Sequence, residues 1–269
     1  VYIGNIQQVS GVANTYSSTT PTFPDRIIRS PINFNGEPQH DTFPATHKMD
    51  VAANDGDSIT ALEGFGDRLL IFKKKTVYVI NVAQDGSEFV ESKFTDVGVD
   101  SPAQVTATEF GVCWINSRGC YIYAEGRPIN LIDEKLSPYA GRRITPNMKW
   151  SISESRFPAV AYLPRNKKLL ISFGFTVSFS NDAWIYDFTQ KSWSLGAGVL
   201  GSHLYERSNF AVDNTGVANF CQLIPTAVVA HSRLSVLAWE DREQPHNEFN
   251  LHFKDLDFGQ PNVRKKVYR

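Results

Sequence analysis

The amino-acid sequence predicts an all-β protein whose strands repeat in blade-sized groups. Three observations carry this prediction: short apolar segments bounded by turn residues, the lack of any long helical period, and hairpins of one layout that recur along the chain. Hydrophobic residues make up 42% and aromatic residues 12% of the 269 residues, which excludes a disordered chain, a collagen and a coiled coil.

Strand-like segments lie at residues 69–72, 76–82, 112–115, 121–123, 169–173, 183–186 and 226–230. They are rich in β-branched and aromatic residues and are bounded by Gly, Asn, Asp or Pro. Several are continuously apolar rather than alternating, which indicates strands covered on both faces. No stretch holds a helical period over about twelve residues, and only single turns of helix are expected, at 133–136 and 147–150.

The strands recur as hairpins of one layout, at residues 66–80, 110–123 and 164–186, with a degenerate fourth at 232–239. The second strand of each hairpin is centred near residues 79, 122 and 185, a spacing of about 43 and then about 63 residues, against the roughly 40–50 of a propeller blade. A ring of blades covers both faces of every sheet, which accounts for the continuously apolar strands. We therefore predict a β-propeller of about five or six antiparallel blades, with a β-sandwich as the alternative.

Three parts of the chain are distinguished. Residues 1–50, polar and rich in Pro and Gly, are expected to form an N-terminal arm or first strand that packs on the propeller. Residues 51–250 are expected to form the blades. Residues 251–269 end the chain with a trailing edge strand, because 249–259 alternate apolar and polar residues, and a further domain beyond them is one interpretation of the abrupt basic ending.

The chain contains three cysteines, two of them in one predicted hairpin. With the turn at residues 116–119, Ile115 faces Cys120 and Cys113 faces Ile122, so a directly opposed disulfide is not expected. The odd count and the lack of a Cys-x-x-Cys spacing argue against a disulfide framework and against a zinc site. Three reduced thiols packed as small hydrophobes are the expectation.

The bulk charge does not indicate a charged partner. The chain has 27 Lys+Arg and 28 Asp+Glu, a formal net charge of −1, which favours neither nucleic acid nor an anionic membrane. No apolar run approaches the roughly 20 residues of a membrane-spanning helix, so no such segment is predicted.

No catalytic, cofactor-binding or metal-binding residue is predicted, and we expect no enzyme activity. The sequence contains no Gly-x-Ser-x-Gly, His-Glu-x-x-His or phosphate-loop motif, and its six histidines are scattered. Residues 54–58 resemble the start of a calcium loop but lack its closing Glu, which favours a tight turn. A propeller enzyme would need converging carboxylates; Asp67, Glu109 and Asp187 are available, and nothing in their spacing singles them out.

The basic run Lys73, Lys74 and Lys75 lies at the tip of a predicted hairpin. A solvated turn is the first interpretation, and a surface that lines a channel for DNA is the alternative.

Several segments together resemble structural proteins of short-tailed bacteriophages, in particular the propeller-bearing tail nozzle (tail tubular protein B) and related tail-hub proteins. They are residues 24–31, 41–44, 54–59, 66–74, 78–81, 110–116 and 254–261. The resemblance implies a virion component at the tail vertex, made in the host bacterial cytoplasm, that forms part of the conduit through which the genome leaves. It implies no catalytic residues.

By this resemblance the partners are copies of the chain in a sixfold ring, neighbouring tail and portal-adaptor proteins, and genome DNA that passes without sequence-specific binding. The residues expected to contact neighbouring subunits are Phe23, Pro24, Phe34, Phe43, Phe175 and Phe179. Two other functions fit the same fold: a carbohydrate-binding, host-recognition propeller with stacking aromatic residues, and a Kelch-like interaction scaffold.

Overall fold

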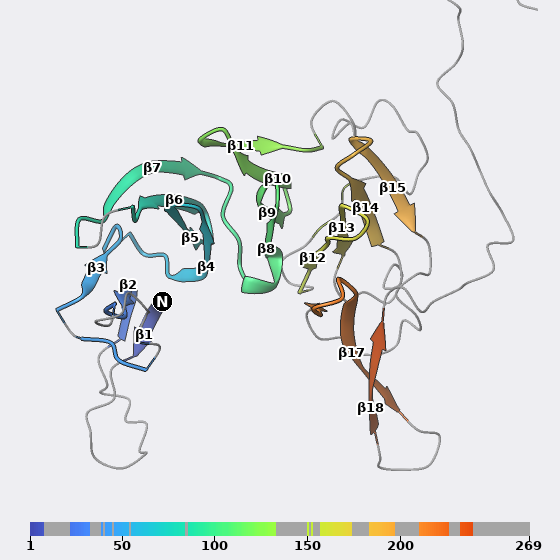
Figure 1. The fold of residues 1–269 in the computed structure, drawn as a ribbon, viewed down its shortest axis with the longest axis horizontal. Coiled ribbons are helices and arrows are strands. Elements are labelled where there is room, and N and C mark those ends of the chain that lie inside the picture. The colour runs from blue at the N-terminus through green and yellow to red at the C-terminus, as the bar shows by residue number, and fades with distance from the viewer. Residues whose placement is uncertain are drawn as a thin grey trace, which may run out of the picture.

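The computed structural model contains five antiparallel sheets that follow one another along an open arc (Figure 1). It describes residues 1–7, 22–32, 39, 41–44, 46–53, 55–83, 86–132, 150, 152, 157–173, 183–196, 210–225 and 232–238. Within these ranges the helical content is one short 3-10 helix, Pro102–Gln104 (η1). The all-β prediction is confirmed.

The first two sheets contain β1 (Tyr2–Gln7), β2 (Thr22–Arg29) and β3 (Lys48–Asp50), then β4 (Ile59–Phe65), β5 (Arg68–Lys73), β6 (Thr76–Asn81) and β7 (Phe89–Thr95). The third contains β8 (Val105–Thr108), β9 (Gly111–Asn116), β10 (Gly119–Ala124) and β11 (Arg127–Asn130). The fourth contains β12 (Ala159–Leu163), β13 (Lys168–Ser172), β14 (Ala183–Asp187) and β15 (Ser192–Gly196). The fifth contains β16 (Ala211–Val212), β17 (Ala218–Pro225) and β18 (Ser232–Ala238).

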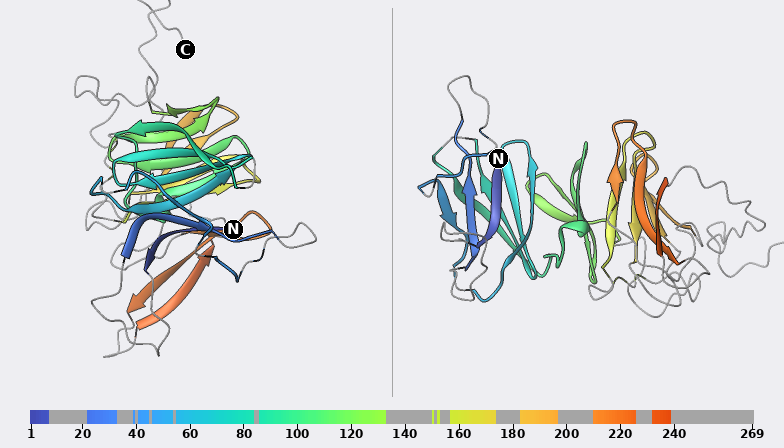
Figure 2. Two further views of the ribbon diagram at one scale, coloured as in Figure 1. Left: turned by 90° about the vertical axis from the view of Figure 1, so that its left-hand side faces the viewer. Right: turned by 90° about the horizontal axis from the view of Figure 1, so that it is seen from below.

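Every sheet is a simple meander, in which each strand pairs antiparallel with the next one along the chain. The first strands of neighbouring sheets lie against one another, since β4 contacts β8 and β8 contacts β12. The sheets therefore pack face to face in chain order, as Figure 2 shows from two further directions. This is the blade arrangement of a β-propeller, with five blades in the part described, and it excludes the two-layer sandwich.

Four apolar clusters lie between consecutive sheets. On β5, Leu70 and Ile71 are both fully buried, yet Leu70 belongs to the cluster shared with the third sheet and Ile71 to the cluster shared with the first. Successive side chains of a strand point to opposite faces, so a sheet between two neighbours needs apolar residues at every position. This explains the continuously apolar segments of the sequence.

The predicted repeat corresponds to the third strand of each blade. Val79, Ile122 and Ile185 lie on β6, β10 and β14. The degenerate fourth hairpin predicted at 232–239 is wrong, because residues 232–238 form the single strand β18, which pairs with β17. The register predicted for the cysteine hairpin is also confirmed, because Cys120 pairs with Ile115 and Ile122 with Cys113.

All three cysteines carry free thiols, and Cys113 and Cys120 are buried. Burial raises the pKa of both thiols above the ordinary value, so they pack as neutral, small apolar groups.

The N-terminal region differs from the expected arm. Residues 2–7, 22–29 and 48–50 form a three-stranded sheet that contributes a blade, with Ile27 exposed by only 2% in the cluster shared with the second sheet. The Pro- and Gly-rich composition obscured these strands, although Ile27 and Ile28 supply the apolar residues that the sheet needs. The turn expected at 133–136, the one at 147–150 apart from Trp150, the strand at 226–230 and the trailing strand at 251–269 lie outside the described residues.

Candidate functional site

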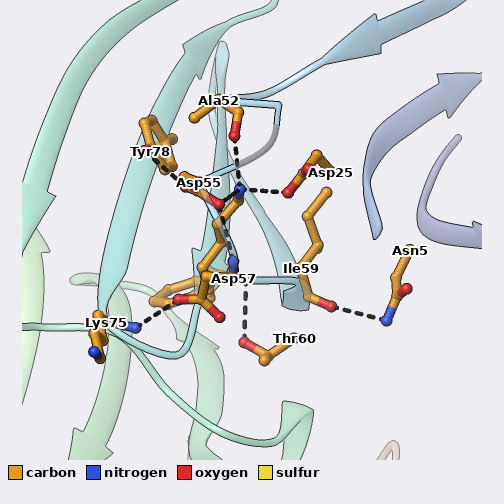
Figure 3. A network of polar contacts seen from close by, with 11 residues as sticks. Asn5, Asp25, Ala52, Asp55, Asp57, Ile59, Thr60, Lys75 and Tyr78 are labelled. Atoms are coloured by element: carbon orange, nitrogen blue, oxygen red, sulfur yellow. Dashed lines mark hydrogen bonds and ion pairs between the residues drawn. The ribbon is translucent and has the colours of Figure 1, made fainter. Parts of the chain in front are cut away.

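The main polar site is a buried ammonium group between the first two sheets (Figure 3). Lys73 is fully buried, and its Nζ donates hydrogen bonds to Oδ1 of Asp25 at 2.6 Å and Oδ1 of Asp55 at 2.8 Å. A third, longer contact of 3.3 Å joins the same nitrogen to the carbonyl oxygen of Ala52. The three acceptors match the three N–H donors of an ammonium group.

The strand period places Lys73 in this position. It follows Leu69 and Ile71 at intervals of two along β5, so it shares their face, which is turned toward the first sheet. Asp25 comes from β2 and Asp55 from the connection between β3 and β4, so the lysine links three separate chain segments. The prediction that Lys73 is an exposed basic tip is therefore wrong.

The network is electrostatically satisfied. Burial alone would lower the pKa of Lys73, but the hydrogen bonds that it donates to Asp25 and Asp55 outweigh it and the pKa is raised. For Asp55, burial alone would raise the pKa, but the hydrogen bond from Lys73 and the one from the main-chain N–H of Asp57 lower it. Lys73 is thus a charged ammonium at neutral pH, which makes it a cross-link between sheets rather than a nucleophile or a base.

The residues predicted as a tight turn, 54–58, use their carboxylates as acceptors for N–H groups. The main-chain N–H of Asp57 donates to Asp55 at 3.0 Å, and that of Lys75 donates to Asp57 at 3.1 Å. In the part of the chain that the structure describes, no group of three or more His, Cys, Asp or Glu is placed to hold a metal ion.

Lys74 and Lys75 are exposed, as expected of a hairpin tip. They line a cleft of about 460 Å³ between the second and third sheets, together with Asp96, Asp100 and Arg118. Arg118 pairs with Asp96 at 3.1 Å, and both side chains are well exposed. Positive and negative groups therefore alternate around this cleft, and it is not a uniformly basic surface.

A smaller cleft, of about 150 Å³, lies at the opposite end of the first two sheets. Arg29 pairs with Glu88 at 2.8 Å, and the hydroxyl of Tyr2 donates to the same carboxylate at 3.4 Å. His47 also lines this cleft, and its buried Nδ1 has no hydrogen-bond partner. The cleft is the size of a few water molecules, and one of them would satisfy the Nδ1 atom.

The interface between the third and fourth sheets is held by aromatic side chains. Trp184 packs edge-to-face on Trp193, with ring centroids 6.1 Å apart, and Trp193 on Trp150 at 5.9 Å. The indole N–H of Trp150 donates to the carbonyl of Asn116, and that of Trp193 to the carbonyl of Leu131, both at 3.0 Å.

The three carboxylates considered for a propeller enzyme have separate local roles. Glu109 accepts a hydrogen bond from the hydroxyl of Tyr162 at 2.8 Å and lies 3.5 Å from Nζ of Lys167. Asp187 caps the turn after β14, where it accepts main-chain N–H bonds from Thr189 and Gln190. Asp67 is exposed in the turn between β4 and β5. These contacts do not connect Asp67, Glu109 and Asp187 to one another.

The residues predicted to contact neighbouring subunits are less exposed than that role predicts. Phe23 and Pro24 on β2 are half-buried, with the guanidinium carbon of Arg26 3.9 Å from the centroid of the Phe23 ring, and Phe43 is half-buried too. Phe34, Phe175 and Phe179 lie outside the described residues.

The well-exposed apolar side chains lie elsewhere, in particular at Val1, Ile32, Phe89, Val90, Phe157 and Val236. In the sequence, the adjacent Phe89 and Val90, followed by the polar Glu91-Ser-Lys of β7, are the signal that could have indicated an exposed apolar surface. Every tryptophan and tyrosine whose burial is described is buried or half-buried.

Within the described residues, no helix has the length and apolar character needed to cross a bilayer. No family model matches the sequence, and a comparison with curated proteins gives no match. Among solved structures, the N-terminal domain of Nup159 aligns with a TM-score of 0.31 and 10% sequence identity, over 80% of this chain and 69% of that one. At this TM-score the fold assignment rests on the sheets themselves.

Proposed function

We propose that this chain is a structural component of a tailed-phage virion, a nozzle or tail-hub propeller that forms part of the genome-ejection conduit at the tail vertex. The observation that carries a role in assembly is the position of the exposed apolar side chains on edge and outer strands. Val1 flanks β1, Phe89 and Val90 begin β7, and Val236 lies on β18, with exposed fractions between 44% and 67%. Apolar groups on strand edges are suited to contacts with neighbouring subunits.

Ion pairs link neighbouring sheets, and the buried one at Lys73 supports a scaffold role. Lys73 joins the first sheet to the second, Arg118 reaches Asp96 from the third sheet, and Lys167 reaches Glu109 from the fourth. Each of these pairs crosses from one sheet, or from the connection that follows it, to the next. A structural protein of a virion needs such links between its sheets, because it transmits force and keeps its shape and carries out no reaction.

The choice of a phage tail rests on the sequence resemblance. In this proposal copies of the chain form a sixfold ring with neighbouring tail and portal-adaptor proteins, and cyclic symmetry repeats one pair of contact patches until the ring closes. The mixed charge of the cleft at Lys74, Lys75 and Asp96 suits DNA that passes without being held, because strong retention requires many unopposed basic groups.

The test is immunogold electron microscopy of particles from the source lysate, with an antibody shown to bind the native chain. Gold at one tail vertex is the expected result. Unlabelled particles would overturn the virion role, and glycan screening of the isolated protein would then follow. A matched pair of variants addresses assembly: Phe89→Ser is expected to weaken ring formation by native mass spectrometry, whereas the exposed Thr95→Ser, on the same strand, leaves it unchanged.

A further inference from the structure

The ionic network between the first two sheets has one member that solvent reaches. The side chain of Lys73 is fully buried and that of Asp25 is exposed by only 13%, whereas that of Asp55 is exposed by 31%. Asp55 also lies in the connection between β3 and β4 and not in a strand. The link between the two sheets therefore depends on a carboxylate in a solvent-accessible turn.

The residue that follows Asp55 is a glycine. Gly56 is exposed and has a positive φ of 78°, and a Cβ atom built on it would meet nothing within 4 Å. Because glycine has no side chain, its main-chain nitrogen can approach the preceding carboxyl group closely. The chain has one other Asp-Gly bond, Asp85-Gly86. At such a bond the main-chain nitrogen attacks the side-chain carboxyl more readily than at any bulkier pair.

The turn folds the Asp55 carboxylate back along its own main chain. Its Oδ1 atom accepts a hydrogen bond from the main-chain N–H of Asp57 at 3.0 Å (Figure 3). A side chain that bonds the backbone two residues ahead lies beside the peptide unit between them, which here includes the Gly56 nitrogen. Asp25 differs, because it lies within β2, where the ladder restrains the main chain that the same attack would have to move.

We propose that Asp55-Gly56 is a site of spontaneous isomerisation and that the ammonium group of Lys73 restrains this reaction. The Gly56 nitrogen forms a bond to Cγ of Asp55, and its proton leaves with the hydroxyl of the protonated carboxyl as water, which gives a five-membered cyclic imide. Water then adds to one of the two imide carbonyls. Opening at Cγ restores aspartate, and opening at the main-chain carbonyl gives isoaspartate of the same mass.

Lys73 opposes the first step in two ways. A hydroxyl group leaves only from a protonated carboxyl, and a neighbouring ammonium group stabilises the ionised form. The contact of 2.8 Å between Nζ of Lys73 and Oδ1 of Asp55 also fixes the carboxylate, which must rotate before Cγ can meet the Gly56 nitrogen. The ion pair thus protects the residue on which it depends.

Isomerisation would remove one side of the ion pair. Isoaspartate carries its carboxylate directly on Cα and lengthens the main chain by one carbon atom, so the carboxylate no longer reaches Lys73 in the same geometry. The product should therefore have a weaker link between the first and second sheets. This inference concerns the chemical durability of that interface and stands apart from the virion role.

The test is the rate at which isoaspartate appears at residue 55 of the full 269-residue chain at neutral pH. Peptide mapping with electron-transfer fragmentation detects it without a change in mass. We expect the folded parent to react at least about tenfold more slowly at this position than the same chain unfolded in guanidinium. Lys73→Met is expected to raise the folded rate at residue 55 by at least about threefold and to leave Asp85-Gly86 unchanged.

Leu170→Ala is the matched control for a general loss of stability. Leu170 is fully buried in the fourth sheet, far along the chain from the network, and its truncation destabilises the fold without touching the ion pair. We expect residue 55 to react in this variant at the parent rate.

Four results would overturn the proposal. The folded and unfolded parent react equally fast at residue 55, which decides the matter even where Lys73→Met does not fold. Lys73→Met leaves the rate at residue 55 unchanged, or Leu170→Ala raises it as much as Lys73→Met does. Finally, Lys73→Met accelerates residue 55 and Asp85-Gly86 to the same extent, which would assign the effect to general unfolding.

Discussion

Two interfaces between neighbouring sheets use opposite chemistry in the same geometry. Between the first and second sheets, a buried ammonium group is shared by two carboxylates that lie 18 and 48 residues away along the chain. Between the third and fourth sheets, Trp150, Trp184 and Trp193 pack edge-to-face, and two of the indole groups donate to backbone carbonyls of the connecting segments.

The difference shows that the blade geometry does not specify how neighbouring blades are held together. The aromatic interface gains stability from buried apolar area and tolerates small shifts. The ionic interface depends on complete pairing, because the Lys73 ammonium has been removed from water and relies on its two carboxylate partners for compensation. The first interface should therefore be the more fragile under single substitutions.

The largest expected effect is at Lys73. The substitution Lys73→Met removes the cation that Asp25 and Asp55 share and is expected to lower the free energy of unfolding by about 3–5 kcal/mol, measured by urea denaturation. Lys74→Met, on the exposed neighbour, is expected to change it by no more than about 0.5 kcal/mol. The triple variant Lys73→Met, Asp25→Asn, Asp55→Asn should recover much of the loss. Equal effects of the two single substitutions would show that the ionic network contributes nothing.

The backbone beside Lys73 permits a test of a second feature, the close approach of the segment after β7 to the end of β5. A Cβ atom on Gly98 would lie 2.1 Å from the carbonyl oxygen of Lys73 and 2.6 Å from the carbonyl carbon of Lys74. Because both obstacles are main-chain atoms, Gly98→Ala is expected to cost about 3 kcal/mol or more. A Cβ on Gly64 meets nothing within 4 Å, so Gly64→Ala serves as the control and should melt close to the parent. A small shift in melting temperature for Gly98→Ala would mean that this close approach is relaxed in solution.

The aromatic interfaces can be compared through two tryptophans. The indole N–H of Trp114, between the second and third sheets, donates to the carbonyl of Val97 at 2.6 Å, whereas the buried N–H of Trp184 has no partner. Both side chains are almost completely buried. Trp114→Phe is therefore expected to destabilise the chain by about 1–2 kcal/mol more than Trp184→Phe, because only the former leaves a carbonyl without its donor. Guanidinium denaturation of the two variants gives the difference, and the reverse order would contradict it.

The smallest expected effect is the pH dependence of the first interface. The pKa of Asp55 is lowered in the folded state, so its contribution is complete above the unfolded value of about 4 and is lost as the pH falls through the folded value. The parent should lose more stability between pH 5 and pH 3 than the triple variant, by about 1 kcal/mol or less since Asp55 is partly exposed. Parallel melting curves of the two proteins over this range would rule out a role for Asp55 in acid stability.

Local sequence was sufficient to predict the two central strands of the middle blades. Residues 69–72 and 76–82 lie in β5 and β6, and residues 112–115 and 121–123 lie in β9 and β10, each within one or two residues of the observed ends. These strands are covered on both faces, so their sequences are apolar runs that few other structures can produce. The cysteine register followed from the same hairpin, because a tight turn fixes which residues face one another.

The outer strands and the inner strand β8 were not predicted, for a physical reason, whereas the inner strand β12 is an apolar run, Ala-Val-Ala-Tyr-Leu, that was not recognised as a strand. β7 exposes most of its side chains, and β8 is the short segment Val-Thr-Ala-Thr, so neither carries an apolar run. These segments become strands because a neighbouring strand supplies a ladder of hydrogen bonds, and local propensity contributes little. The sequence over β1 and β2 favours an arm on the same grounds, since Pro24 and the polar residues around it are typical of a loop.

The sequence by itself therefore determined the fold class, the repeat and the pairing of the central hairpins, because those depend on side chains close together in the chain. Only the tertiary structure decided that Lys73 is buried while Lys74 and Lys75 are exposed. The strand period places Lys73 on the face of Leu69 and Ile71, but the sequence does not show that carboxylates meet it there. The environments of the three lysines differ because one of them lies on the face that meets Asp25, and that meeting depends on how two sheets pack.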